Sequence, residues 1–150
     1  MLVDPIEGEE LYTLLPHSGE MRLIDKVVDW NESEINCRTQ THLMHSNPLR
    51  NNNQLSAVHA AEYGAQAMAL HGGLLAKKSG ENQPGGYLVS LRGVKLHVQR
   101  LDTLDGPLIV QAKQLLADSG NMLYDFALRT ERNPIAEGRA AVIVHSEKSQ

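Results

Sequence analysis

The segment between residues 56 and 76 constrains the fold of this chain more than any other. Apolar and small residues recur in it at steps of three and four, which places them along one stripe of a helix: Val58, Ala61, Ala65, Met68, Gly72 and Leu75. Ser56 stands where an N-cap is expected. Small side chains also occupy the other sides: Ala57, Ala60, Gly64, Ala67, Ala69 and Gly73. Because neighbouring backbone can approach such a helix closely, the pattern predicts one long helix enclosed by a curved sheet.

Most of the remaining chain is typical of β-strands. Alternating or β-branched segments predict strands over residues 23–30, 35–41, 87–98, 108–113, 122–129 and 135–145, and a short helix over 6–15 ends at Pro16. Gly93 interrupts one strand, which predicts a bend or bulge, and Ser119–Asn121 indicates a tight hairpin. We therefore expect a single α+β domain over residues 1–150, with an antiparallel sheet of five to six strands wrapped around one central helix.

Composition and charge disfavour several classes of protein. The chain has 150 residues, a formal net charge of −4 and no long run of like charges, so a general nucleic-acid binder is not expected. Its acidic opening differs from a signal peptide, and the longest uncharged stretch, 63–76, is too short to span a bilayer. Cys37 is the only cysteine. We expect a cytoplasmic protein without a membrane span.

Four motifs in order resemble the 3-hydroxyacyl-ACP dehydratases of fatty-acid synthesis, which have the hot-dog fold. The motifs are the Leu-Pro-His segment at 15–28, Glu62-Tyr-Gly-Ala-Gln66, the long strand at 88–98 and the final hairpin at 121–144. Asn47-Pro-Leu-Arg50 and His71-Gly72 further resemble a branch of this family that is associated with aryl-polyene lipid clusters. The resemblance covers roughly residues 10 to 146.

This resemblance implies a reaction and its partners. The expected reaction converts a 3-hydroxyacyl thioester on acyl carrier protein to the trans-2-enoyl thioester, in fatty-acid or polyene-lipid biosynthesis. No cofactor is implied beyond the phosphopantetheine of the acidic carrier, and the sequence contains no metal-ligand spacing or phosphate-binding loop. The implied assembly is a homodimer or higher homo-oligomer, with a second dehydratase-like subunit as a further option.

The chemistry requires a base for the C2 proton and an acid for the departing 3-hydroxyl group. Glu62 is the expected acid, because it is the only Asp, Glu, Lys or Arg between residues 51 and 76. The family's catalytic histidine is missing, since Pro48 stands fourteen residues before Glu62. His17, in the shared Leu-Pro-His motif, is therefore the first candidate for the base, and His42 and His45 are alternatives.

Other residues are expected to support these two. The N–H groups of Ala57 and Val58 at the helix start are candidates for an oxyanion hole, and Gln66 for a hydrogen bond to Glu62. The carrier or its pantetheine arm is expected to meet four polar residues: Asn47, Arg50, Arg92 and Lys95. Two other functions stay open. One is a hot-dog thioesterase in which Glu62 activates water, and the other is a non-catalytic hot-dog protein that binds a carrier or a partner dehydratase.

Overall fold

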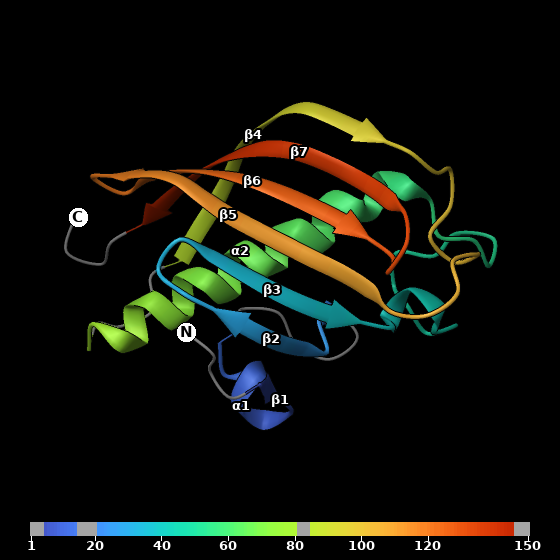
Figure 1. Cartoon of the computed structure of the whole chain (residues 1–150), viewed down its shortest axis with the longest axis horizontal. Helices are drawn as coiled ribbons and strands as arrows, with labels where there is room; N and C mark the ends of the chain where they lie inside the picture. The colour runs from blue at the N-terminus through green and yellow to red at the C-terminus, as the bar shows by residue number, and fades with distance from the viewer. Residues whose placement is uncertain (1–4, 15–20, 81–84, 146–150) are drawn as a thin grey trace.

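The computed structural model describes residues 5–14, 21–80 and 85–145, with residues 85–89 and 144–145 described by their backbone alone. Seven antiparallel strands form one curved sheet in the order β1-β2-β3-β5-β6-β7-β4. Their bounds are β1 Ile6–Glu7, β2 Lys26–Trp30, β3 Glu34–Thr39, β4 Gly85–Leu96, β5 Leu108–Asp118, β6 Asn121–Arg129 and β7 Pro134–His145. The sheet curves over one long helix, α2 (Ala60–Lys78), as Figure 1 shows. This arrangement confirms the predicted hot-dog architecture.

The strand count is seven rather than five to six because of the N-terminal segment. A single helix was predicted over residues 6–15, whereas the structure has the two-residue strand β1 followed by the four-residue helix α1 (Glu9–Tyr12). Ile6 pairs with Val27 of β2 and is buried, so sheet pairing prevails over helix formation there. Leu11 and Leu14, three residues apart in the predicted helix, are nevertheless both buried.

Two turn features agree with the sequence predictions. The β5–β6 hairpin turns at Ser119 and Gly120, whose φ angles of 52° and 84° match the twist that a tight antiparallel hairpin requires. In β4, the register against β7 shifts between Arg92 and Lys95, and Gly93 there has a φ of 59°. The glycine therefore makes the bulge that its position in the strand predicted.

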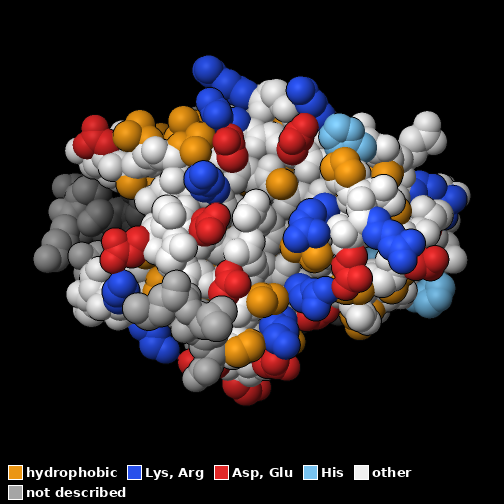
Figure 2. All heavy atoms as spheres, in the orientation of Figure 1, with side chains coloured by type: hydrophobic (Ala, Val, Ile, Leu, Met, Phe, Trp, Pro, Cys, Tyr) orange, Lys and Arg blue, Asp and Glu red, His pale blue; other side chains and the backbone are white. Residues whose placement is uncertain are grey.

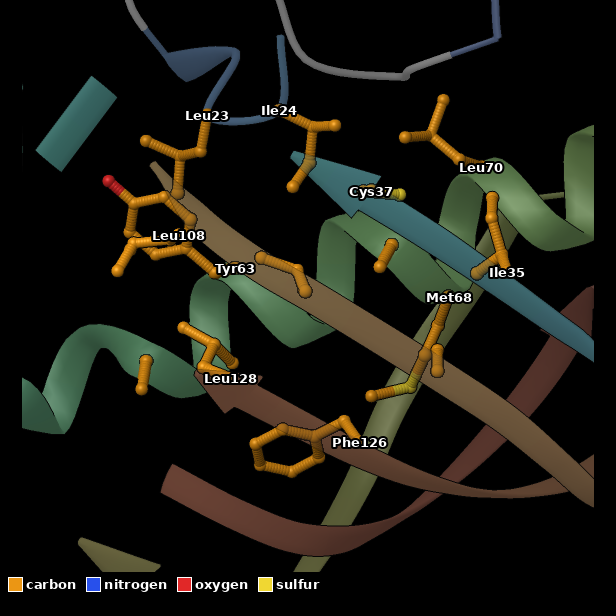
Figure 3. Packing of buried hydrophobic residues seen from close by; sticks show 14 of the residues in the cluster. Leu23, Ile24, Ile35, Cys37, Tyr63, Met68, Leu70, Leu108, Phe126 and Leu128 are labelled. Carbon is orange, nitrogen blue, oxygen red and sulfur yellow. The ribbon is translucent and has the colours of Figure 1, made fainter. Parts of the chain in front are cut away.

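Small residues on α2 allow the sheet to come close, as the sequence indicated. A Cβ at Gly64 would lie 2.7 Å from Cδ1 of Phe126, the only phenylalanine in the chain. Figure 3 shows Tyr63 of α2 gathered with Leu108 of β5 and Leu128 of β6, and all three are buried in the core. Strands β3, β5 and β6 supply most of the sheet's contact with the helix.

Among the described residues, two strands of the sheet are paired on one side only, β1 and β4. Strand β4 is 12 residues long, and only β7 pairs with it in the described chain. Its side chains Leu91, Val94 and Leu96 are each about two-fifths exposed. A long strand with one unpaired edge and exposed apolar side chains is a surface that other chains readily pair with. None of the helices in the described residues is long and apolar enough to cross a membrane.

Candidate functional site

Glu62 lies on the face of α2 that the sheet leaves uncovered. Helical spacing places it on one side with five apolar or small residues, and we call this set the open face: Val58, Ala61, Glu62, Ala65, Ala69 and Gly72. Val58 is 62% exposed, Glu62 is exposed, and the small residues of the open face are half-buried. The Glu62 carboxylate makes no hydrogen bond or ion pair with the described residues. It is therefore a free carboxylate on an otherwise apolar face, and a single chain does not bury it.

The residues beside Glu62 on the buried side fix that turn of α2. The Tyr63 hydroxyl lies 2.9 Å from Oγ1 of Thr41 and accepts a hydrogen bond from the Asn47 amide at 3.1 Å. Asn47 also donates to the Thr41 carbonyl at 3.0 Å. Both Tyr63 and Asn47 are buried, so this network joins α2 firmly to the loop that follows β3. Asn47 was predicted to contact the carrier, but its amide is committed within the chain.

Gln66 makes a different contact from the predicted one. Its side chain is 1% exposed; Nε2 donates to the Met21 carbonyl at 2.6 Å, and Oε1 accepts from the Leu23 N–H at 2.8 Å. The amide is thus used on both sides by the backbone of residues 21–23, and it does not bond Glu62. Gln66 joins this segment to α2 one turn after Glu62. His17, the predicted base, lies outside the described residues.

His42, one alternative base, is completely buried. Its Nε2 lies 3.1 Å from the Leu104 carbonyl oxygen. A carbonyl can only accept, so Nε2 carries the hydrogen and Nδ1 is an unprotonated nitrogen without a partner. Burial lowers the pKa of His42 below its usual value, and the nearby Arg50 charge adds to the effect. The lowered pKa favours the neutral imidazole and makes it a weaker base, and no part of the side chain is exposed.

The other loop residues are held locally. His45 is exposed, and its Nδ1 lies 3.1 Å from Oδ1 of Asn53. Arg50, predicted to contact the carrier, donates to the Asn53 carbonyl at 3.1 Å and to the His42 carbonyl at 3.0 Å. These bonds give Arg50 a role in closing the loop on itself.

The start of the helix distinguishes the two predicted oxyanion donors. A 3₁₀ turn, Ala57–His59, leads into α2. The Ala57 N–H donates to the Gln99 carbonyl at 3.0 Å, so it is already used. The Val58 N–H has only a 3.3 Å contact with the Ser56 hydroxyl, which is a long hydrogen bond. Val58 is therefore the donor of the two that a substrate oxygen can recruit more easily.

Residues 99–102 hold this helix start in place, a contact that the sequence analysis missed. Leu101 N–H donates to the Leu55 carbonyl at 2.8 Å, and the Asp102 carboxylate accepts from the Leu55 N–H at 2.8 Å. Arg100 Nη2 lies 2.5 Å from Asp102 Oδ2. The hydrogen bond from Arg100 holds the pKa of Asp102 well below its usual range. An Arg–x–Asp pair is too common a pattern to predict such a contact across 47 residues.

Arg92 and Lys95 lie on the other face of the sheet. Cross-strand register places Arg92 opposite Arg139 and Lys95 opposite Glu137, whereas Phe126, opposite Gly138, points toward α2. Arg92 and Lys95 line a hollow of about 880 Å³ on the face turned away from the helix. They are therefore separated from Glu62 by the sheet. No group of three or more His, Cys, Asp or Glu residues suited to a metal ion occurs among the described residues.

The structure is similar to known hot-dog proteins. "The Dehydratase Heterocomplex ApeI:P from Xenorhabdus doucetiae" contains a chain that is 22% identical, with a TM-score of 0.82 and 92% of each chain covered. The thioesterase HI1161 from Haemophilus influenzae is 17% identical, with a TM-score of 0.61 and coverage of 92% of this chain and 90% of that one. A hypothetical thioesterase from Streptococcus pneumoniae with coenzyme A is 9% identical, with a TM-score of 0.60 and coverage of 80% and 84%.

Sequence comparison gives the family. No curated protein sequence matches significantly. A family model does match, over residues 9–150, and its description is "ApeP dehydratase". The match includes the candidate acid, the helix that carries it and every strand from β2 to β7. The chain therefore belongs to the ApeP-like dehydratase family.

Proposed function

We propose that this protein removes water from 3-hydroxyacyl thioesters carried by acyl carrier protein and forms trans-2-enoyl thioesters during polyene-lipid biosynthesis. The observation that carries the proposal is the dehydratase family match over residues 9–150. The free carboxylate of Glu62 on the open face of α2 agrees with it, because elimination needs an acid that reaches the substrate.

In the proposed mechanism Glu62 is the general acid and His17 the general base. His17 removes the proton from C2, and Glu62 protonates the 3-hydroxyl group, so that the C3–O bond breaks, water leaves and the C2–C3 double bond forms. The thioester oxygen gains negative charge as the proton leaves. The Val58 N–H at the positive end of the helix is the donor we assign to that oxygen.

The contacts of Gln66 support the choice of His17. Leu14, just before the undescribed segment, is buried, and Met21, just after it, is bonded to Gln66 at 2.6 Å. In the sequence, His17 is four residues before Met21, the residue whose carbonyl Gln66 bonds. His42 is the weaker choice because its imidazole is completely buried and a substrate cannot contact it. His45 is exposed, and its hydrogen bond among the described residues is with Asn53 in the same loop rather than with α2.

We propose that a second hot-dog subunit completes the site. The open face of α2 and the unpaired edge of β4 both expose apolar side chains that one chain leaves uncovered. The partner is a second copy of this chain or a second dehydratase-like subunit, and the Xenorhabdus structure, described as a heterocomplex, supports the latter option. A light-scattering mass equal to one 16.5 kDa chain at micromolar concentration, unchanged when candidate partners are added, contradicts this assembly.

Mass spectrometry of purified protein mixed with 3-hydroxyacyl carrier protein tests the reaction. The proposal predicts a carrier-bound product lighter by the mass of one water. Loss of the whole acyl group indicates a thioesterase. An unchanged substrate, with and without a second subunit, indicates a protein that only binds.

A further inference from the structure

The start of α2 is bonded at three points to the segment at residues 99–102, which follows β4. The Leu55 carbonyl accepts from the Leu101 N–H at 2.8 Å, and the Ala57 N–H donates to a second backbone group of this segment at 3.0 Å. The third bond comes from a side chain, because the Asp102 carboxylate accepts from the Leu55 N–H at 2.8 Å. Figure 1 shows the chain after β4 running beside the beginning of α2. The residues that lead into the helix are therefore held from one side by a single short segment.

An ion pair within that segment holds the Asp102 carboxylate in place. Arg100 donates to both of its oxygens, with Nε 3.1 Å from Oδ1 and Nη2 2.5 Å from Oδ2. A two-pronged bond between a guanidinium and a carboxylate is both strong and directional. The Asp102 side chain is only 7% exposed, and the bond from Arg100 holds its pKa well below the usual range. At neutral pH the carboxylate is therefore charged, fixed in direction and bonded to the Leu55 N–H.

The Val58 N–H lies between backbone groups that are already bonded. Before it, the Ala57 N–H is used by the segment after β4, and after it the His59 N–H donates to the Ser56 carbonyl at 3.2 Å. The carbonyl of the peptide that carries the Val58 N–H accepts from the Ala60 N–H. Because that peptide is planar, fixing its carbonyl and the residue before it also fixes the direction of the Val58 N–H. This N–H has only the long 3.3 Å contact with the Ser56 hydroxyl, so it is fixed in direction but weakly used.

We propose that Arg100 and Asp102 are positioning residues, whose ion pair fixes the start of α2 so that the Val58 N–H meets the thioester oxygen as it gains charge. This inference rests on the proposed function. A donor that is already oriented lowers the barrier, because it does not have to turn as the negative charge develops. A shift of about 1 Å in an active site, caused by a change outside it, can reduce a rate about a hundredfold. Neither residue contacts the substrate, and both act through the backbone of the helix start.

Asp102→Asn removes the charge that binds Arg100 and nearly keeps the shape of the side chain. Asp125→Asn is the control, because Asp125 also pairs with an arginine, Arg139, at 2.9 Å, but on the face of the sheet turned away from α2. Figure 2 shows that face, where acidic and basic side chains lie interspersed. Arg100→Gln is a second variant for the case in which Asp102→Asn does not fold. The Arg100 side chain is 40% exposed, and its loss leaves the bond between Asp102 and Leu55 in place.

Amide hydrogen exchange, followed by NMR, tests the structural half of the proposal without any substrate. The Leu55 N–H is bonded to Asp102 itself, whereas the Ala57 N–H is bonded to the Gln99 carbonyl. Both amides exchange faster only if the ion pair holds the whole segment. We expect exchange at both to be at least about fivefold faster in Asp102→Asn, and within about twofold of wild type in Asp125→Asn. Exchange at Ala57 that stays at the wild-type rate in Asp102→Asn overturns the proposal.

Steady-state rates of the assembled enzyme with 3-hydroxyacyl carrier protein test the catalytic half. A donor that acts in the transition state predicts a kcat about tenfold or more below wild type in Asp102→Asn and at least about threefold below it in Arg100→Gln, with KM within about twofold. The control is expected to keep the wild-type kcat. An ion pair that only stabilises the fold leaves kcat unchanged below the thermal midpoint, and one that serves substrate binding raises KM alone; either result overturns the proposal.

These rates also separate the inference from the function on which it rests. A wild-type assembly that dehydrates nothing refutes the proposed function and the positioning role together. An active wild type with an unchanged kcat in both Asp102→Asn and Arg100→Gln refutes the positioning role alone.

Discussion

Adding a methyl group to α2 at Gly64 tests how closely the sheet approaches the helix. A glycine-to-alanine change inside a helix normally stabilises it by about 1 kcal/mol. At Gly64, however, the new Cβ would lie 2.7 Å from Cδ1 and 2.8 Å from Cγ of Phe126. The same ring also packs closely over Gly138, its cross-strand partner, where a Cβ would lie 2.9 Å from Cε2, so it has little room to shift away from Gly64. Such overpacking costs about 1–3 kcal/mol.

Gly72 on the same helix is the matched control. A Cβ there meets nothing within 4 Å, so Gly72→Ala keeps the helix gain without the clash. The free energy of unfolding, measured by urea denaturation with circular dichroism, should be lower for Gly64→Ala than for Gly72→Ala by about 1–3 kcal/mol. Adding Phe126→Leu to Gly64→Ala should recover part of the loss, because the two sites share one contact. Equal stability of the two alanine variants would refute the packing argument.

Three further outcomes follow from individual contacts. Burial lowers the pKa of both His42 and His71 below the unfolded value, so the unfolded chain binds more protons than the folded one in acid. The folded state should therefore lose stability as the pH drops below about 6.5. A thermal midpoint that increases when the pH is lowered from about 7 to about 5 would contradict this. His71→Gln should flatten this dependence, since His71 is bonded to the Tyr124 hydroxyl at 2.7 Å and the Asn31 carbonyl at 2.8 Å. Ser56→Ala should cost about 1 kcal/mol in unfolding free energy and Ser56→Asp little, because aspartate also caps helices; equal losses would show that the capping contact is unimportant. Gln66→Leu should cost about 1–3 kcal/mol by leaving the Leu23 N–H and Met21 carbonyl unpaired, and hydrogen exchange of the Leu23 amide that stays as slow as in wild type would contradict this.

Local sequence signals predicted most of the fold. Period-two alternation predicted β6, and the β5–β6 hairpin follows from Ser119-Gly120. The small residues of α2 predicted a helix enclosed by a sheet, and Gly64 against Phe126 is the contact behind that signal. Each of these features depends on residues close together in the chain or on a helix that must face the core.

Long-range partners were not predictable in the same way. Helical spacing placed Glu62 and Gln66 one turn apart, but the Gln66 amide bonds residues 43 and 45 positions away in the chain. By its position at the helix start, the Ala57 N–H was expected to be free to bind a substrate oxygen. In the structure it donates instead to the carbonyl of Gln99, in the segment at residues 99–102. Glu62 was selected as the acid because it is the only charged residue of an apolar segment. In the structure that apolar surface is the open face, which one chain leaves uncovered.

The rate of dehydration by Glu62→Gln tests the central claim most directly. Glutamine keeps the shape of the side chain but cannot supply the proton, and Glu10→Gln in α1 is a control with the same loss of charge at another exposed position. Single-turnover rates with 3-hydroxyacyl carrier protein are measured by mass spectrometry for the assembled enzyme. Our account predicts a rate about a hundredfold or more below wild type for Glu62→Gln, with an unchanged thermal midpoint, and a wild-type rate for Glu10→Gln. A Glu62→Gln rate within about threefold of wild type would contradict the assignment of Glu62 as the acid.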